Sequence, residues 1–107
     1  MDRADLTMSV SHREDETVVS LAGELDISTA DQLAKIVNEE LRLGPGRMVL
    51  DLAGLTFCDS LGLGTLVVLS RAARIQQTFL QVRNPSEFFS RMLDVTGVRQ
   101  SLNIAEV

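Results

Sequence analysis

An aspartate followed by a serine, Asp59-Ser60, is the pair in this chain whose residue types and position could carry chemistry. The pair lies between an apolar stretch that predicts a strand, Met48 to Leu52, and one that predicts a helix, Leu61 to Gln76. Aspartate and serine at such a junction satisfy the free N–H groups of the first helical turn. Because a helix N-terminus carries partial positive charge, it would also tolerate a phosphate on Ser60.

Two glycines, Gly62 and Gly64, follow the serine and keep the first turn of this expected helix bare. Each glycine costs roughly 1 kcal/mol relative to alanine inside a helix. The repeated cost indicates that another group approaches the backbone here.

We expect no enzymatic role for this stretch, because the other residues that catalysis or dinucleotide binding would need are missing. A serine nucleophile needs a base, but the single histidine, His12, lies in an expected surface turn, and no Gly-x-Ser-x-Gly elbow surrounds Ser60. The sequence Gly62-Leu63-Gly64 lacks the third glycine of a dinucleotide fingerprint, because Val67 stands in its place. The acidic neighbour of Cys58 disfavours a thiolate, so we interpret this residue as packing. We expect no enzyme, no cofactor and no metal site.

The composition favours protein partners. A chain of 107 residues with 45% hydrophobic and 23% charged residues is typical of one soluble globular domain. The net charge of -5 argues against direct nucleic-acid binding and against an anionic membrane surface. One cysteine fits a reducing cytoplasm. The start of the chain has no apolar signal core, and no apolar run approaches the ~20 residues of a membrane span.

The first half of the chain predicts a hairpin and then a helix. Leu6 to Ser11 and Thr17 to Ala22 alternate apolar and polar residues, with a polar turn from His12 to Glu16 between them. Gly23 to Asp26 is expected to be a loop, and Ser28 to cap the helix that follows. Apolar residues recur at helical spacing along that helix, at Leu33, Ile36, Val37 and Leu41.

The second half predicts further strands that alternate with helices. Met48 to Leu50 is a continuous apolar run that fits a central strand, and Phe79 to Val82 is a fourth strand. Asn84-Pro85-Ser86-Glu87 predicts a helix start with proline in the first position, followed by a buried stripe and a weak last strand at Ser101 to Ile104. The stripe consists of Phe88, Phe89, Met92 and Leu93. This order indicates an α/β domain with a mixed sheet.

Four motifs in a fixed order carry a resemblance to a known family. They are Leu21-Ala22-Gly23-Glu24-Leu25-Asp26, Val49-Leu50-Asp51-Leu52, Phe57 to Gly64, and Asn84-Pro85-Ser86 with Leu93 to Val98. As a set they resemble the STAS domain of the stand-alone bacterial anti-sigma factor antagonists. The resemblance implies a single STAS domain over residues 1–107, with its core at about 7–104. It implies a mixed sheet of four to five strands with packed helices.

The resemblance also implies a function. In that family the serine after the aspartate, here Ser60, is phosphorylated by an anti-sigma factor that is also a serine protein kinase. The unphosphorylated antagonist binds the anti-sigma factor and so frees the sigma factor for transcription, and a phosphatase of the PP2C type reverses the modification. We therefore expect a cytoplasmic protein, either a monomer or a weak homodimer. The alternative is a STAS scaffold or subunit of a lipid-transport or stress-signalling complex, without a phospho-switch.

Two features depart from the family pattern. Leu61 stands where many relatives carry a second hydroxyl residue, which leaves Ser60 as the only acceptor in the motif. Gln76-Gln77-Thr78 replaces the usual glycine pair before the fourth strand and predicts a longer helix end.

A helical wheel of the helix after Ser60 predicts the binding face. Its core side would hold Leu61, Thr65, Val68, Leu69, Ala72, Ala73 and Ile75, and its solvent side Ser60, Leu63, Gly64, Val67, Arg71 and Arg74. Apolar Leu63 and Val67 beside Ser60 then indicate a partner patch, to which we also assign Asp59, Gly62 and Arg71. The alternatives are scattered surface apolar residues or cover by the N-terminal hairpin.

Asp26 and Thr29 are further candidates for partner contact. The loops at the ends of strands in α/β sheets meet near one rim, so both residues could border Ser60. The alternative for Asp26 is a turn aspartate without a further role.

Overall fold

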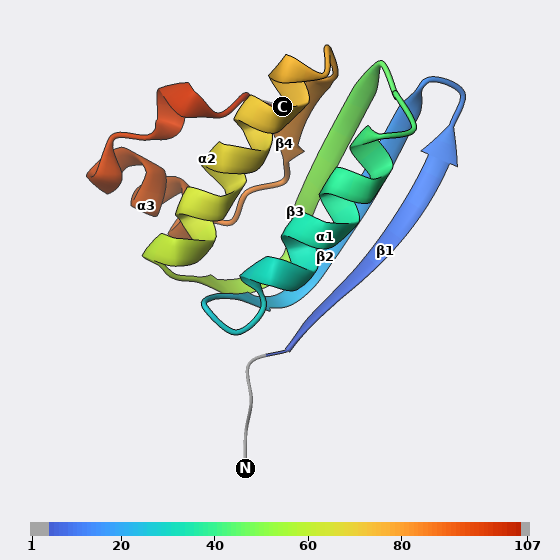
Figure 1. Ribbon diagram of the computed structural model, residues 1–107. Helices are drawn as coiled ribbons and strands as arrows, with labels where there is room; N and C mark the ends of the chain where they lie inside the picture. Colours follow the sequence, from blue (N-terminus) through green and yellow to red (C-terminus); the bar gives the residue numbers. More distant parts are fainter. Residues whose placement is uncertain (1–4, 106–107) are drawn as a thin grey trace.

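Four strands form one sheet in the order β1-β2-β3-β4 in this computed structural model, which describes residues 5–105 (Figure 1). β1 (Leu6–Arg13) pairs antiparallel with β2 (Glu16–Leu25). β3 (Arg47–Cys58) pairs parallel with both β2 and β4 (Phe79–Arg83). The expected α/β domain with a mixed sheet is confirmed, and β3 is the interior strand that the apolar run predicted.

The N-terminal hairpin is longer than its alternation indicated. Its turn consists of Glu14 and Asp15 alone, and Glu14 adopts a positive φ of 39° there. At the other end Gly23, Glu24 and Leu25 belong to β2, so the loop expected there was wrong. Glycine and glutamate are poor strand formers, but pairing with β1 and β3 on both sides outweighs that weak local preference.

β3 also continues further than expected, through Phe57 and Cys58. Met48, Leu50 and Leu52 point from it into the core and are fully buried. The residues after Leu52 alternate less clearly, because the register between β2 and β3 shifts twice near Gly54 and Phe57. The irregular stretch resembles a loop in sequence although it is hydrogen-bonded to β2.

Two parallel helices, α1 (Ala30–Leu41) and α2 (Ser60–Ile75), lie side by side on one face of the sheet (Figure 1). The N-cap of α1 is Thr29, so the expected cap Ser28 was wrong. α2 ends at Ile75, one residue before the expected Gln76, because Gln76 is the C-cap and Gln77 takes a left-handed conformation with φ of 62°. The longer helix end expected there was also wrong.

α3 (Glu87–Thr96) contacts the 3₁₀ helix that follows it and ends at the left-handed Gly97. Its N-cap is Ser86, whose hydroxyl accepts from the Phe89 N–H at 3.0 Å, so Pro85 precedes the cap and is not the first helical residue. Phe89 and Leu93 are buried as predicted, whereas Phe88 is 49% exposed and was wrongly placed in the stripe.

The C-terminal segment closes one edge of the sheet. A short 3₁₀ helix, Arg99–Ser101, leads to Leu102, which is buried in the core. The Val82 N–H donates to the Asn103 carbonyl at 2.7 Å, and the Ala105 N–H donates to the Val82 carbonyl at 2.8 Å. The expected last strand is therefore reduced to one parallel bridge, between Val82 and Ile104.

Candidate functional site

Ser60 is the first residue of α2 and is exposed, at the end of the sheet where β2 and β3 finish. Asp59 is the N-cap, and its Oδ1 accepts from the Gly62 N–H at 2.7 Å. The expected position of the pair at a strand-to-helix junction is confirmed. The cap satisfies one free N–H group of the first turn. Ser60 follows this cap directly, as the first residue of the helix.

The two glycines after Ser60 have different surroundings. Gly62 is buried, and a Cβ there would lie 2.5 Å from the carbonyl oxygen of Leu25 and 2.9 Å from its Cγ. The group that approaches the backbone at Gly62 is therefore the end of β2. A Cβ on Gly64 would meet nothing within 4 Å, and this residue is exposed.

The loop after β2 adjoins the Ser60 turn, as the common-rim argument predicted. Leu25 pairs with Cys58, and the Asp59 N–H donates to the Leu25 carbonyl at 3.2 Å. Asp26 follows Leu25, and its Oδ1 accepts from the Ser28 N–H at 2.9 Å and the Ser28 hydroxyl at 2.8 Å. The hydrogen bond from the Ser28 side chain, helped by the backbone and Thr29, lowers the pKa of Asp26. The carboxylate is therefore ionised and held as an Asx-type turn.

Thr29 is only 1% exposed and has a structural part in this loop. Its hydroxyl donates to the Glu24 carbonyl at 2.8 Å and accepts from the Asp26 N–H at 2.9 Å. Both partners belong to the chain itself, so Thr29 holds the loop in place and does not present a group to solvent.

The predicted faces of α2 were wrong in part: Leu69 and Ala73 are buried and Ser60, Gly64, Arg71 and Arg74 are exposed as predicted, but other residues are exchanged between the faces. Leu63 is 3% exposed, and Val67 packs against the core. Conversely, Leu61 is 48% and Val68 59% exposed, and Ile75 at the end of the helix is 82% exposed. Apolar residues surround nearly the whole helix, so their pattern gives little direction, and the buried stripe includes Gly62 and Ser70, which the wheel assigned to neither side.

A groove of about 460 Å³ runs between α1 and α2, with Ser60 at one end. Its α1 wall has the small side chains of Ala30 and Ala34, and its α2 wall has the exposed Leu61 and Val68. Gly64, Thr65, Leu69 and Ala72 complete the α2 side, and Asp31 and Asn38 the α1 side. Because the α1 side chains are small, they leave space between the two helices. The apolar side chains of α2 that the wheel assigned to the core therefore line an open groove.

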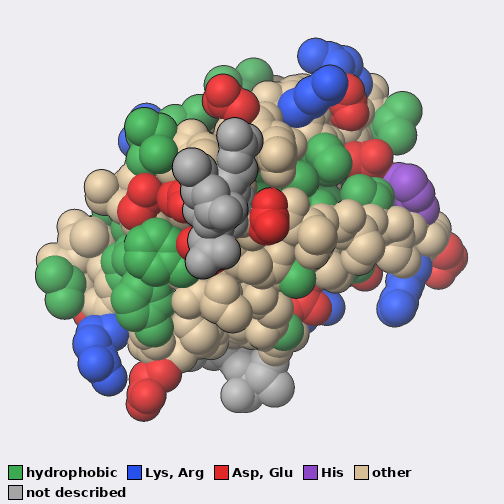
Figure 2. Space-filling view, turned by 90° about the horizontal axis from the view of Figure 1, so that it is seen from below, with side chains coloured by type: hydrophobic (Ala, Val, Ile, Leu, Met, Phe, Trp, Pro, Cys, Tyr) green, Lys and Arg blue, Asp and Glu red, His purple; other side chains and the backbone are tan. Residues whose placement is uncertain are grey.

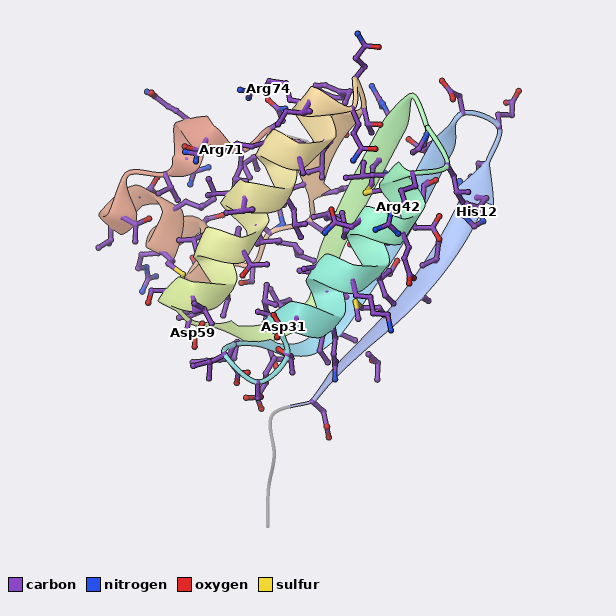
Figure 3. All side chains as sticks on the ribbon, in the orientation of Figure 1. His12, Asp31, Arg42, Asp59, Arg71 and Arg74 are labelled. Carbon is purple, nitrogen blue, oxygen red and sulfur yellow. The ribbon has the colours of Figure 1, made fainter. Side chains whose placement is uncertain are left out.

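The two ends of the α1–α2 pair differ in charge. Figure 3 shows Asp31 and Asp59 near the starts of α1 and α2, and Arg42, Arg71 and Arg74 near their other ends. None of the residues that line the groove is basic. Arg71 is exposed but does not line the groove, so its assignment to a patch with Leu63 loses its geometric basis. Figure 2 shows acidic and apolar side chains together on the end of the molecule that carries the loops after β2 and β3.

Exposed apolar side chains near Ser60 were missed by the sequence argument. Ile27, in the loop after β2, is 77% exposed. Phe57 at the end of β3 and Phe88 at the start of α3 are stacked, with ring centroids 6.4 Å apart and an interplanar angle of 20°. The spacing of Ala30 and Ala34 on one face of a helix was the available signal for the groove. The Phe57–Phe88 contact joins residues 31 positions apart, so no local pattern could have indicated it.

Cys58 is buried beneath this turn, and burial, with a smaller effect of the Asp59 charge, raises the pKa of its thiol to about 12. Within residues 5–105 no group of three histidine, cysteine, aspartate or glutamate side chains comes together around a possible metal position. No helix in that range is long and apolar enough to cross a bilayer.

A family model described as "Mlab, STAS domain" matches residues 8–104 of this chain. The chain therefore belongs to the STAS domain family. The family resemblance predicted from the ordered motifs is confirmed.

Several known relatives and solved structures are similar to this chain over most of its length. The chain is 26% identical over 102 residues to the anti-sigma-B factor antagonist of Staphylococcus epidermidis, covering 95% of this chain and 94% of that protein. An anti-sigma factor antagonist from Mycobacterium paratuberculosis has a similar crystal structure, with a TM-score of 0.80 and 25% identity over 96% of this chain and 87% of that one.

The anti-sigma factor antagonist SpoIIAA shares the fold at 20% identity, in two solved forms. The unphosphorylated form has a TM-score of 0.76 and matches 94% of this chain and 89% of that chain. The phosphorylated form has a TM-score of 0.70 and matches 94% of this chain and 92% of that chain.

Proposed function

We propose that this protein is an anti-sigma factor antagonist that binds an anti-sigma factor with serine kinase activity and is switched off by phosphorylation of Ser60. The observation that supports this most strongly is an exposed serine at the first position of α2, at the end of an apolar groove. The curated relatives are named as antagonists of anti-sigma-B factor, and SpoIIAA is a protein of this fold with a phosphorylated form.

The electrostatics around Ser60 favour a switch that acts on binding. A phosphate would add about -1.5 to -2 charges beside Asp59 and Asp31, in a chain whose net charge is already -5. The N-terminus of α2 offsets roughly 0.3 to 2 kcal/mol of that repulsion, so the fold tolerates the modification. A partner seated on the groove would have to desolvate the phosphate or supply arginines, which costs several kcal/mol when they are absent.

Calorimetric titration with the cognate anti-sigma factor, together with thermal unfolding of each form, tests this mechanism. Ser60→Ala should bind like the unmodified chain and accept no phosphate. The phosphorylated chain should bind at least tenfold more weakly while its unfolding midpoint stays within a few degrees. Equal affinities for the two forms would contradict the switch and favour the scaffold alternative, and a phosphorylated chain that unfolds would contradict the mechanism itself.

The partner surface that we propose consists of Ser60, Leu61, Gly64 and Val68, with Asp26 and Asp59 at its rim. Val68→Glu places a charge in the groove, so it should weaken binding by about tenfold or more without changing stability, because Val68 is 59% exposed. Ile75→Glu is the matched control, since Ile75 is on the same helix, is 82% exposed and does not line the groove. An equal loss of affinity in both variants would contradict this location.

Reversal of the modification completes the proposed cycle. A phosphatase of the PP2C type would remove the phosphate from Ser60, and exposure of this serine allows such an enzyme to reach it. Both enzymes act in the cytoplasm in this proposal. Incubation of the phosphorylated chain with a PP2C phosphatase should restore the affinity of the unmodified chain.

A further inference from the structure

β1 is an edge strand, and its outer backbone groups pair with no strand of the described residues 5–105. It pairs with β2 on one side, whereas residues 103–105 cover part of the opposite edge of the sheet at β4. The Glu24 N–H donates to the Asp5 carbonyl at 2.8 Å, and Leu6 pairs with Gly23. Because orientations alternate along an antiparallel strand, Thr7, Ser9, Ser11 and Arg13 direct their backbone groups to β2, and Leu6, Met8, Val10 and His12 direct theirs outward.

β1 has few of the features that prevent an edge strand from pairing with a strand of another molecule. Its eight residues include no proline and no lysine, and the β1–β2 register runs without a bulge from Leu6 to Arg13. α1 packs on β2, and within residues 5–105 Figure 1 shows no helix or strand beyond β1 on the outer side. Met8 and Val10 consequently remain only partly buried at the margin of the core.

The sequence of β1 is complementary to itself when read antiparallel about Ser9. In that register Asp5 lies opposite Arg13 of a second copy, Thr7 opposite Ser11, and Ser9 opposite Ser9. Met8 then lies opposite Val10 and Leu6 opposite His12. The outward-directed residues pair only with each other, as an antiparallel ladder requires.

We propose that two copies of this chain associate through their β1 strands, in the antiparallel register centred on Ser9, to form one continuous eight-stranded sheet. Four outward residues on each strand would give about eight new hydrogen bonds. Opposite charges meet at both ends, through two Asp5–Arg13 pairs, and the partly buried Met8 and Val10 cover each other. The groove beside Ser60 lies between α1 and α2, away from β1, so both copies keep it open. This association does not depend on the proposed function.

Charge reversal tests the two ends of the register. Asp5→Arg places arginine opposite Arg13, and Arg13→Asp places aspartate opposite Asp5, so each variant alone should raise the dimer dissociation constant by about tenfold or more. In an equimolar mixture of the two variants every such pair has opposite charges, so heterodimers should recover the original affinity. Sedimentation velocity over a concentration series measures all three cases. Both side chains are exposed, so the fold should be unaffected, which circular dichroism checks.

A cysteine at the symmetry axis tests the centre of the register. The two Ser9 residues form a non-hydrogen-bonded pair, whose Cα atoms lie about 4.5 Å apart, within the range of a disulfide. Ser9→Cys should therefore form a covalent dimer on mild oxidation. Ser11→Cys is the matched control, because its own symmetry mate lies about 14 Å away along the strand. The native Cys58 is buried and does not contribute.

The cross-linking and association experiments distinguish the proposed dimer from a monomer and from other modes of association. Covalent dimers from Ser9→Cys but not from Ser11→Cys, with recovery of association in the charge-swapped mixture, support the proposal. A chain that stays monomeric at millimolar concentration, a mixture no tighter than its components, or equal cross-linking of both cysteine variants would overturn it.

Discussion

Gly62 and Gly64 are two positions apart in one helical turn, yet they have opposite effects on packing. The Cβ of Gly62→Ala would lie 2.5 Å from the Leu25 carbonyl oxygen, which belongs to the backbone and has little room to move. We expect this variant to lower the free energy of unfolding by about 1–3 kcal/mol, the usual cost of overpacking. Denaturant unfolding measures the loss.

Gly64→Ala is the matched control in the same helix. Its Cβ would meet nothing within 4 Å, so the gain in helix propensity remains, and stability should rise by about 0.5–1 kcal/mol. If both variants were destabilised by the same amount, the turn would exclude side chains for some reason other than contact with β2.

Cys58 provides a test of burial beneath the Ser60 turn. Because burial raises the pKa of its thiol to about 12, the folded protein keeps it protonated and unreactive at pH 8. Reaction with a chromogenic disulfide reagent should be at least a hundredfold slower in buffer than in denaturant. Fast reaction in buffer would show that the turn opens readily.

The same shift has a consequence for stability at high pH. The unfolded thiol loses its proton near pH 9.0 and the folded thiol only near pH 12, so the unfolded state binds fewer protons in between. The contribution of Cys58 is therefore complete below pH 9 and falls as the pH rises toward 12. The sequence has no tyrosine, so no phenol titrates beside the thiol in that window. Cys58→Ala should flatten this limb of the stability curve.

The C-terminus of α2 has the hydrogen bonds of a Schellman motif without its usual glycine. The Thr78 N–H donates to the Ala73 carbonyl at 2.9 Å, and the Gln77 N–H donates to the Arg74 carbonyl at 3.0 Å. Gln77 has a φ of 62° between them, which costs a residue with a Cβ about 1 kcal/mol. Gln77→Gly should therefore raise the free energy of unfolding by about 0.5–1 kcal/mol in a denaturant titration.

Gln76→Gly is the control for that prediction. Gln76 has a φ of -92°, which any residue adopts, so glycine there gains nothing and adds flexibility to the unfolded chain. Its stability should fall by a few tenths to about 1 kcal/mol. A gain in both variants would indicate that the glutamine side chains themselves disfavour this helix end.

One core connects all the elements of the molecule, including the short C-terminal segment after α3. Leu102 is 5% exposed and belongs to the same hydrophobic cluster as Leu50 and Leu66. Leu102→Ala should lower the free energy of unfolding by about 2–4 kcal/mol because it leaves a cavity. Thermal unfolding should show a single transition, shifted to lower temperature.

Val95→Ala is the control for this whole-domain prediction, because Val95 is 81% exposed at the outer side of α3. Its midpoint should stay within a degree or two. A separate early transition in Leu102→Ala would show that the C-terminal segment unfolds independently of the sheet.

The sequence alone determined the features that depend on local chemistry and on strong periodicity. The hairpin, the apolar interior strand, the Asp59-Ser60 junction and the ordered family motifs were all predicted. Each is encoded within a few neighbouring residues: alternation defines a strand, and a capping aspartate defines a helix start. The position of Ser60 at the head of α2 is local in this sense, and it was predicted correctly.

The tertiary structure decided which face of each element is buried and what the exposed faces form together. α2 is apolar on most sides, so only packing against β3, β4 and α1 selects Leu63 for the core and Leu61 and Val68 for the groove. The small residues of α1 that open this groove, and the stacking of Phe57 on Phe88, involve partners distant in sequence. Burial is a property of the assembled layers, and a single helix that is apolar all round contains no information about which neighbour it will meet.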